Sequence, residues 1–297
     1  MSHWTAQNIP DQKGKVAIIT GGNAGLGFEI TKQLAAKNAT VIIACRTESK
    51  GLDAIQRIEK SFKKEIHAEV IPLDLTRMDS IKAFAQKFKN RYVQLDLLIN
   101  NAGVVNLKER MTTAEGFEMH MATNHLGHFA LTGLLYDIIK NTPHSRVVTV
   151  SSGGHRSGDI DFEDFNWEKR PYGRVKSYGD SKLANLLFMN SLQEKFDREN
   201  IPSLSVAAHP GLSATERQQS IGIGGWLSKI AAQPVWRGAL PALRAATDPK
   251  VKPTEYYGPQ YGIAGYPTLS KIDAKAFDQE VAHKLWVLSE ELTGIKF

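Results

Sequence analysis

The stretch 16–37 constrains the fold of this chain more than any other part of the sequence. An apolar run at 16–19 leads into the glycine-rich turn 20–27, with the sequence TGGNAGLG, and apolar side chains then recur at helical spacing, as at Ile30 and Leu34. A phosphate-binding loop requires this order of strand, turn and helix. Glycines permit the tight turn, and the helix N-terminus presents unpaired N–H groups to phosphate oxygens. We therefore predict a nucleotide-binding turn here.

The glycine spacing alone does not decide between a nucleotide site and an ordinary turn. Gly21, Gly25 and Gly27 follow the pattern T-G-x-x-x-G-x-G instead of the common G-x-G-x-x-G fingerprint. Polar or turn residues also follow three later apolar runs, namely 100–103 (NNAG), Ser151 with Ser152, and Pro210 with Gly211. Ligands of open α/β sheets bind outside the carboxyl ends of the parallel strands. We therefore expect all four segments to meet at one edge of a sheet.

Apolar runs alternate with segments of helical spacing along most of the chain. We expect strands near 15–20, 40–45, 66–72, 95–100, 146–151, 203–208 and 260–264. Helices are expected near 25–37, 48–62, 77–90, 113–140, 178–199 and 274–291. This alternation predicts an α/β protein with a single-domain Rossmann fold over 1–297, in which helices cover both faces of a doubly wound parallel sheet of about seven strands.

Two segments fall outside this alternation. Residues 1–13 form a polar N-terminal arm, and 212–258 mixes glycines and prolines with apolar residues. Because the second segment follows a strand at the ligand edge, we expect it to be a substrate lid. Its apolar residues are Ile221, Ile223, Trp226 and Trp236. The alternative is that these residues pack in the core or in a subunit interface.

Composition argues against several classes of function. The chain has 37 Lys and Arg against 31 Asp and Glu, a net charge of +6. Its basic clusters, such as 60–64, fit a solvated helix face, so we expect no nucleic-acid partner. The single cysteine, Cys45, permits neither an internal disulfide nor a thiolate cluster. No histidine pair has metal-ligand spacing, so no metal site is expected.

The N-terminal residues and the apolar runs bear on location. Residues 1–14 lack the apolar core of a secretion signal, and no run approaches the roughly 20 apolar residues that cross a bilayer. We expect a cytoplasmic protein without a transmembrane segment, in which any membrane contact is peripheral.

A second motif, YGDSK at 178–182, places a phenol and an ammonium group four residues apart. On a helix, Tyr178 and Lys182 would share one face. A free phenol has a pKa of about 10, too high for efficient proton transfer near neutrality. A lysine at about 4 Å would stabilise the phenolate by at most about 4 kcal/mol at an effective dielectric constant of 20, equivalent to about three pKa units. We therefore expect a tyrosine acid–base group tuned by lysine.

Taken in chain order, these motifs resemble the short-chain dehydrogenase/reductase family over nearly the whole chain. The stretches 44–46 (ACR), 123–129 (TNHLGHF) and 181–185 (SKLAN) resemble its retinol-dehydrogenase-like branch and the bacterial relatives of that branch. The resemblance implies hydride transfer between a nicotinamide cofactor and a carbonyl or alcohol carbon. In that reaction the oxygen is protonated in the same event as hydride transfer.

By this resemblance the catalytic residues are Asn124, Ser152, Tyr178 and Lys182, with Ser151 as the fallback for Ser152. The serine would orient the substrate oxygen, and the asparagine would support a proton relay to the lysine. The alternative for Asn124 is an asparagine bonded inside its own helix. The interval between Ser152 and Tyr178 is longer than in many members of the family, and we interpret it as a pocket loop. We expect Asp180 to be solvated or to face a subunit interface.

The choice of cofactor is expected to depend on Arg46. NAD-preferring Rossmann proteins carry an acid near the end of the second strand, but 41–47 contain none. A guanidinium at this point can pair with the 2′-phosphate of NADP(H); the alternative is a surface arginine paired with Glu29 or Glu48. Together with the residues that the resemblance implies, the expected cofactor-binding set is Gly21, Asn23, Gly25, Leu26, Gly27, Arg46, Asp74, Leu75, Asn101, Ala102, Gly103, Tyr178, Lys182, Pro210, Gly211 and Thr215.

The expected function is an NADP(H)-dependent oxidoreductase that interconverts a lipophilic ketone or aldehyde and its alcohol, in a chain that can form a homo-oligomer. Two alternatives stay open. A nucleotide-sugar epimerase or dehydratase, of the extended branch of the family, shares the tyrosine and lysine. That branch carries a larger C-terminal domain, for which the chain after Gly211 is short. A non-catalytic dinucleotide-binding sensor would not need all four catalytic residues.

Overall fold

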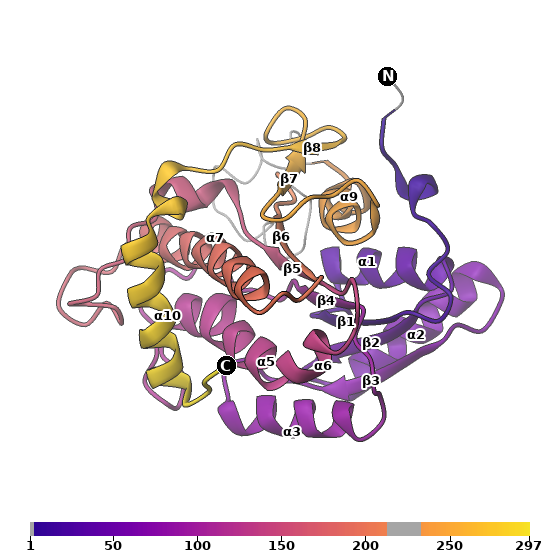
Figure 1. Cartoon of the computed structure of the whole chain (residues 1–297), viewed down its shortest axis with the longest axis horizontal. Coiled ribbons are helices and arrows are strands. Elements are labelled where there is room, and N and C mark those ends of the chain that lie inside the picture. Colours follow the sequence, from indigo (N-terminus) through magenta and orange to yellow (C-terminus); the bar gives the residue numbers. More distant parts are fainter. Residues whose placement is uncertain (1–2, 213–232) are drawn as a thin grey trace.

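The computed structural model describes residues 3–212 and 233–297. Its centre is an eight-stranded sheet with the order β3-β2-β1-β4-β5-β6-β7-β8 (Figure 1). Strands β1 to β7 run parallel, and β8 pairs antiparallel with β7 at one edge. The strands are β1 (Val16–Thr20), β2 (Thr40–Cys45), β3 (Ala68–Pro72), β4 (Leu97–Asn100), β5 (Arg146–Val150), β6 (Leu204–Ala208), β7 (Tyr256–Pro259) and β8 (Pro267–Leu269).

The strand order reverses beside β1, and this reversal positions the site. In the register of the sheet, Ala17 of β1 lies between Val41 of β2 and Leu97 of β4. The chain therefore leaves β1 toward one edge and later returns to build the other edge from β4 onward. Such a switch point opens a crevice outside the carboxyl ends of the strands. All five residues of β1 are buried, as expected for a strand covered on both faces.

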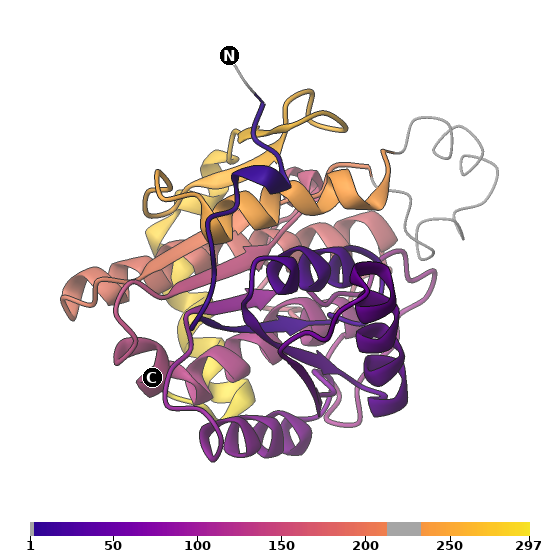
Figure 2. The ribbon, with the colours of Figure 1, turned by 90° about the vertical axis from the view of Figure 1, so that its right-hand side faces the viewer.

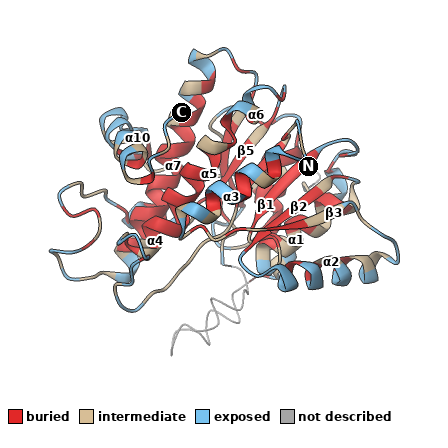
Figure 3. Ribbon diagram, turned by 90° about the horizontal axis from the view of Figure 1, so that it is seen from below, coloured by how far each residue is buried: buried red, intermediate tan, exposed pale blue. Residues whose placement is uncertain are grey.

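Helices cover both faces of the sheet. On one face lie α1, α2 and α9, with α1 and α9 side by side (Figure 2). The other face carries α3, α5, α6 and α7, and α10 lies against α7 and α5. Figure 3 shows the strands and much of α7 in the colour of buried residues. The helices are α1 (Gly25–Ala36), α2 (Glu48–Phe62), α3 (Met78–Lys89), α4 (Met119–Met121), α5 (Gly127–Leu134), α6 (Tyr136–Lys140), α7 (Arg174–Arg198), α9 (Val235–Thr247) and α10 (Gln279–Thr293).

Within the described ranges, none of these helices combines the length and the apolar character that crossing a bilayer would need. Short helical turns complete the architecture. They are η1 (Ala6–Asn8), the π-helical turn η2 (Ala122–Leu126), η3 (Gly153–Ser157) and η4 (Ala274–Phe277).

The single long helix expected at 113–140 begins later than expected, at Met119, and is interrupted. Residues 113–117 form a turn, in which Gly116 has a φ of +87° and the Thr113 N–H donates to the Phe117 carbonyl. The carboxylate of Glu118 then caps α4 by accepting from the Met121 N–H at 2.8 Å. The turn η2 separates α4 from α5. Apolar side chains continue at near-helical spacing through η2, so the sequence pattern conceals the break.

The C-terminal part of the sheet also differs from expectation. The sheet has eight strands instead of about seven, because the single strand expected at 260–264 is replaced by β7 and β8 on either side of it. Residues 260–264 form the connecting turn, where the Gly262 N–H donates to the Pro259 carbonyl. Helix α7 begins earlier than expected, at Arg174. The expected helix 274–291 is divided into η4 and α10, and Asp278 caps α10 by accepting from the Val281 N–H at 3.0 Å.

The range expected as a lid, 212–258, is not one structural unit. Ile221, Ile223 and Trp226 fall in 213–232, outside the described residues. The remainder contains α9 and the start of β7, which belong to the main fold. The buried face of α9 packs on α1 and the sheet, because small and branched apolar residues recur on it: Ala239, Leu240, Ala242, Leu243, Ala245 and Ala246.

Candidate active site

The glycine-rich turn between β1 and α1 uses backbone conformations and contacts that only glycine supplies. Gly21 and Gly25 have φ values of 66° and 54°, in the left-handed region that costs glycine no steric penalty. A Cβ at Gly27 would collide with the Gly21 carbonyl oxygen. Ala24 precedes α1 without a side-chain cap. The first-turn N–H groups of α1 are therefore available to phosphate oxygens.

A hydrogen-bonded link joins this turn to the end of β4. Thr20 Oγ1 accepts from the N–H groups of Asn101 and Ala102, both at 2.8 Å. In return, Asn101 Nδ2 donates to the Thr20 carbonyl at 2.7 Å. A Cβ at Gly21 would lie 3.3 Å from Ala102 Cα. The expected residues of the first and fourth strand ends therefore face one another across the switch point.

Arg46 follows the end of β2 directly. Arg46 is exposed, and among the residues that the structure describes it forms no ion pair, so the alternative pairing with Glu29 or Glu48 is not observed. The neighbouring Cys45 is buried and its Sγ lies 3.4 Å from the Thr47 carbonyl oxygen. Burial raises the pKa of this thiol, which fits a packing residue and not a nucleophile.

Asp74 and Leu75 lie just beyond β3, on the same edge. Asp74 Oδ1 accepts from the Thr76 N–H at 3.0 Å and from Thr76 Oγ1 at 2.7 Å. The Leu75 carbonyl packs so closely on Gly127 that a Cβ there would collide with it. These contacts fix the loop that follows β3 at this edge of the sheet.

The two serines after β5 have different environments. Ser151 is buried, and its Oγ donates to the Lys182 carbonyl at 2.8 Å. Ser152 Oγ accepts from the Gly154 N–H at 3.1 Å and forms a side-chain hydrogen bond with Tyr178. Burial raises the pKa of Tyr178, and the Ser152 bond opposes that rise. The geometry therefore pairs the tyrosine with Ser152, and the fallback Ser151 is committed to the backbone of α7.

Lys182 lies on the same side of α7 as Tyr178. Its Nζ donates to the Val150 carbonyl at 2.9 Å and is 5.7 Å from the centroid of the Tyr178 ring. Burial lowers the pKa of Lys182 to about 7. The lowered phenol pKa that we expected from a nearby lysine is therefore not found in the protein alone: burial raises the pKa of Tyr178 instead.

Asn124 lies in η2 and bonds outside its own helix. Its Oδ1 accepts from the Val104 N–H at 2.8 Å, and its Nδ2 donates to the Val104 carbonyl at 3.0 Å and to Ser181 Oγ at 2.9 Å. A Cβ at Gly103 would lie 2.9 Å from Asn124 Oδ1 and 3.6 Å from Lys182 Nζ. Gly103 therefore lets the asparagine and the lysine approach the same point. A π-helical turn at a functional residue is a common arrangement.

The segment after β6 closes the crevice on its far side. Gly211 has a φ of 65°, and a Cβ there would collide with the Ile263 carbonyl. Gln233 Nε2 donates to the Pro210 carbonyl at 2.8 Å. Burial lowers the pKa of His209 to about 4, and its Nδ1 accepts from the Gly211 N–H at 3.3 Å. A small pocket here is lined by Leu26, Ile30, Asn101, Val150, Ala208, His209, Pro210, Gly238 and Ala242.

Two of the expected cofactor residues add little to this geometry. Asn23 is partly exposed in the glycine-rich turn, and Thr215 lies outside the described residues. Within the described parts of the chain, no three or more His, Cys, Asp or Glu side chains are grouped as metal ligands would be.

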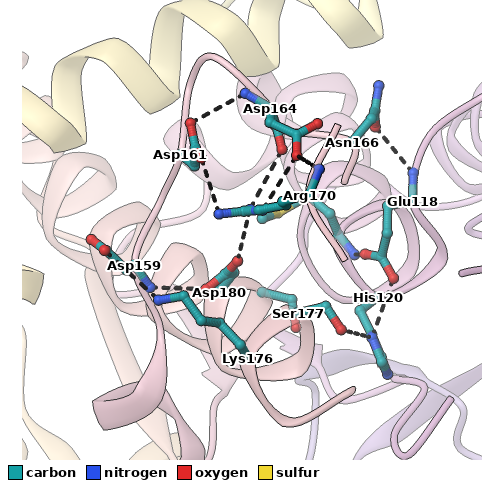
Figure 4. A network of polar contacts seen from close by, with 12 residues as sticks. Glu118, His120, Asp159, Asp161, Asp164, Asn166, Arg170, Lys176, Ser177 and Asp180 are labelled. Atoms are coloured by element: carbon teal, nitrogen blue, oxygen red, sulfur yellow. Dashed lines mark hydrogen bonds and ion pairs between the residues drawn. The ribbon is translucent and has the colours of Figure 1, made fainter. Parts of the chain in front are cut away.

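Asp180 differs from expectation. It is 2% exposed, and its carboxylate accepts from the Asp159 N–H at 2.8 Å and lies 3.5 Å from Arg170 Nη2. Both partners belong to the segment 158–173, which we call the insertion. The expectation of a solvated Asp180 is wrong, because the insertion folds over the first turns of α7 and covers it (Figure 4).

Sequence reasoning also missed a buried cluster beside Tyr178. Glu118 and His120 are 1% and 0% exposed, and they contact Tyr172 of the insertion and Ser177 of α7. An acid two residues before a histidine, which itself precedes Asn124 by one helical turn, is a signal that could have found this cluster.

Comparisons with known proteins agree with this geometry. The family model described as short chain dehydrogenase matches residues 15–223. Retinol dehydrogenase 12 of Homo sapiens is 38% identical, over 96% of this chain and 88% of its own; retinol dehydrogenase 13 of Homo sapiens is 36% identical, over 95% and 86%. A crystal structure of an uncharacterized protein from Mycobacterium paratuberculosis is 36% identical with a TM-score of 0.84, covering 100% of this chain and 99% of that one. The chain therefore belongs to the short-chain dehydrogenase/reductase family of NAD(P)-dependent oxidoreductases.

Proposed function

We propose that this chain is an NADP(H)-dependent enzyme that interconverts a lipophilic ketone or aldehyde and its alcohol. The observation that carries the proposal is the meeting of Ser152, Tyr178 and Lys182 at the edge of the sheet where the glycine-rich turn also lies. The serine bonds to the phenol, and the lysine is fixed near the same ring. A sensor that only bound the dinucleotide would have no use for a proton-transfer group at this point.

The cofactor fits the residues at the nucleotide end. A Cβ at Gly27 would fill the space against the Gly21 carbonyl, and a Cβ at Gly103 would intrude between Asn124 and Lys182. These glycines keep the cradle open for a close approach of the pyrophosphate and the nicotinamide half. When bound, the nicotinamide supplies or accepts the hydride.

The protein's own groups would manage the oxygen and its proton. Ser152 Oγ would donate to the carbonyl oxygen and orient it, while the Tyr178 hydroxyl would deliver the proton. Because burial raises the pKa of Tyr178, the phenol is protonated near neutrality, which is the form that reduction requires. Lys182 Nζ, fixed by the Val150 carbonyl, would hold the ribose hydroxyls. Asn124 would support the return of a proton toward that lysine.

The preference for NADP(H) is inferred from Arg46. Its exposed guanidinium follows β2 directly and forms no ion pair within the described residues. A guanidinium can make two charge-assisted hydrogen bonds to the 2′-phosphate, which NAD(H) lacks. No carboxylate in 41–47 would repel that phosphate.

A lipophilic substrate is supported by the apolar residues beside the site. Val175, one turn before Tyr178 on α7, is 64% exposed, and Leu212, directly after Gly211, is 37% exposed. The two human relatives are named for retinol, a lipophilic alcohol.

A turnover assay with purified protein tests the proposal. NADPH oxidation is followed against carbonyls graded by size and polarity, with retinal among them, and NADH is the parallel donor. We expect turnover that rises with apolar area and is faster with NADPH. Tight NADPH binding without turnover of any carbonyl, and without oxidation of the matching alcohols, would support the sensor instead.

A further inference from the structure

His120 is a fully buried polar side chain next to the proposed proton donor. Its Nδ1 lies 3.0 Å from the Tyr172 hydroxyl, 3.1 Å from Ser177 Oγ and 3.2 Å from Glu118 Oε1. Figure 4 shows Glu118 and Ser177 converging on this ring nitrogen. Tyr172 comes from the insertion, and Ser177 directly precedes Tyr178. The histidine therefore connects three separate segments at the start of α7.

Glu118 determines which ring nitrogen carries the hydrogen. Burial alone would raise the pKa of this carboxyl, but hydrogen bonds from His120 and from the Met121 N–H hold the pKa below its usual value. Glu118 is therefore ionised near neutrality and can only accept. The Tyr172 hydroxyl donates to it at 2.8 Å. A nitrogen lone pair at 3.2 Å from a carboxylate would be repelled, so His120 Nδ1 carries the hydrogen.

The second ring nitrogen of His120, Nε2, differs from Nδ1. Nε2 is buried and, among residues 3–212 and 233–297, has no hydrogen-bond partner. His125, five residues later, shares this feature: its Nε2 lies 2.9 Å from Ser289 Oγ of α10, and its Nδ1 is buried without a hydrogen-bond partner among the described residues. The feature that distinguishes His120 is therefore its neighbour, Tyr178.

The ring of His120 contacts the ring of Tyr178. Their centroids are 5.7 Å apart at an interplanar angle of 67°, an edge-to-face arrangement. Lys182 Nζ also lies 5.7 Å from the Tyr178 centroid. The Tyr172 ring lies nearly parallel to the His120 ring, with centroids 6.5 Å apart and an interplanar angle of 5°. The imidazole, bonded at Nδ1, is thus a fixed wall against which the phenol ring rests.

A second cluster holds the insertion to α7 at Asp180, two residues after Tyr178. Arg170 forms ion pairs with Asp161 at 3.1 Å, with Asp164 at 3.4 Å and with Asp180 of α7 at 3.5 Å (Figure 4). Its guanidinium also lies over the Trp167 ring, 3.7 Å from the centroid. The insertion is therefore bonded near the start of α7 at two points, through Tyr172 to His120 and through Arg170 to Asp180.

We propose that His120 is a positioning residue for Tyr178: its ring holds the phenol at the angle that proton transfer needs, and Glu118 keeps that ring in one tautomer and orientation. The inference rests on the proposed function, because it takes Tyr178 as the proton donor. It assigns the insertion a role beyond lining a pocket, since Tyr172 completes the bonds that fix the histidine.

Kinetics of matched variants test the proposal. His120→Ala removes the wall, and a misplacement on the order of 1 Å can cost about 100-fold in rate, so we expect kcat to fall about 10- to 100-fold with the NADPH Kd unchanged. His120→Phe retains the ring edge and is expected to recover most of kcat. His125→Ala makes the same substitution at an equally buried histidine of the same segment. It is expected to lower the melting temperature while leaving kcat at the wild-type value.

Three results would overturn the proposal. They are a wild-type kcat in His120→Ala, a kcat in His120→Phe as low as in His120→Ala, and an equal loss of kcat in His125→Ala. If His120→Ala does not fold, Glu118→Gln serves instead, because it retains the side-chain length and the acceptor for the Met121 N–H. The neutral amide no longer fixes the tautomer of His120, and we expect kcat to fall several-fold with the melting temperature nearly unchanged. An unchanged kcat would contradict the role of Glu118.

A measurement without turnover separates this inference from the proposed function. In cofactor-free protein with 15N-labelled histidine, NMR is expected to show a hydrogen on His120 Nδ1, with a signal that disappears in His120→Phe. A hydrogen on Nε2 alone would overturn the tautomer assignment. If Tyr178→Phe retains turnover, the proposed function fails while this signal stays. If Tyr178→Phe is inactive and His120→Ala is fully active, only the positioning role fails.

Discussion

The proposed nucleotide side and the proposed proton-transfer side of this site are built in different ways. The nucleotide side consists mainly of backbone, namely two left-handed glycines and a helix N-terminus without a side-chain cap, and adds one exposed arginine side chain after β2. The proton-transfer side consists of buried titratable side chains, among them Glu118, His120 and Lys182. The first side provides shape and N–H groups. The second provides groups whose protonation depends on their surroundings.

The difference follows from what each side must do. A pyrophosphate carries its charge throughout, so a turn with free N–H groups is sufficient to bind it. A proton transfer needs groups fixed in a water-poor environment, where their pKa values depart from those in water. Substitutions on the two sides should therefore separate binding from rate.

The largest expected effect is that of Tyr178→Phe. The change removes only the hydroxyl that would carry the proton, so kcat should fall about 10²- to 10⁴-fold. The NADPH Kd should stay within about twofold, because the glycine-rich turn is untouched. Steady-state kinetics and fluorescence titration of NADPH measure the two quantities. A variant that keeps kcat, or one that loses cofactor binding to the same extent as rate, would break the division between the sides.

The complementary change on the nucleotide side is Gly27→Ala. Its methyl group would collide with the Gly21 carbonyl, and overpacking against backbone costs about 3 kcal/mol at the upper end of the usual range. We expect a lower free energy of unfolding and loss of NADPH binding. Gly14→Ala is the control: Gly14 has a φ of +81° with no atom within 4 Å of a Cβ, so it should lose some stability and keep cofactor affinity. Equal NADPH affinities in the two variants would count against the cradle.

The third prediction concerns stability against pH. Burial raises the pKa of Asp180 to about 6 from the reference value of 3.8, against the opposing effects of the Asp159 N–H and Arg170. The folded protein therefore binds this proton more tightly than the unfolded chain, so the stabilisation is greatest at low pH and is lost as pH rises from about 4 through 6. The unfolding free energy of wild type minus that of Asp180→Asn should fall by about 2–3 kcal/mol over this interval.

Urea denaturation at a series of pH values measures this difference. Asn can still accept from the Asp159 N–H, so the variant should fold. A difference that does not vary between pH 4 and 7 would show that Asp180 has an ordinary pKa, and that burial under the insertion does not perturb it.

The smallest expected effect is on cofactor preference. Arg46→Asp should change the ratio of the NADPH and NADH dissociation constants by about tenfold or more, since hydrogen bonds to a charged group contribute about 1.5–3 kcal/mol. Arg77→Asp reverses the same charge at another exposed arginine, one that pairs with Asp79, and should leave the ratio unchanged. Equal shifts in the two variants would mean that the net charge of the protein, and not Arg46, sets the preference.

The parts of the fold that could be predicted are those whose sequence pattern is complete within a single helix or strand. Strands β1 to β6 and helices α1 to α3 lie close to their expected bounds, because full burial makes a strand read as an unbroken apolar run. The prediction of one helix at 113–140 was wrong because η2 preserves apolar spacing while it adds a residue to the turn. The prediction of a single strand at 260–264 was wrong because β7 and β8 are short strands joined by a turn at Gly262.

The same rule applies to the site. Gly21, Ser152 and Tyr178 lie in local motifs, and the structure brings them to one edge. Asp180 was misjudged because its partner Arg170 belongs to the insertion, whose fold no local pattern specifies. The bonds of His120 were missed because one partner, Tyr172, is 52 residues away in sequence. Contacts of this kind depend on how the insertion packs, which a single sequence does not reveal by periodicity.

The π-helical turn η2 limits how this segment can vary in length. A π-helical turn contains about one residue more than an α-helical turn, so Glu118 and His120 before it keep their angular relation to His128 after it only while that residue is present. Deleting one residue within 118–128 would rotate one half against the other by about 100°. Insertions and deletions should therefore be tolerated in the loop 105–117 and not in 118–128. A deletion in 118–128 would change the position of Glu118 and His120 relative to the segment that contains Asn124.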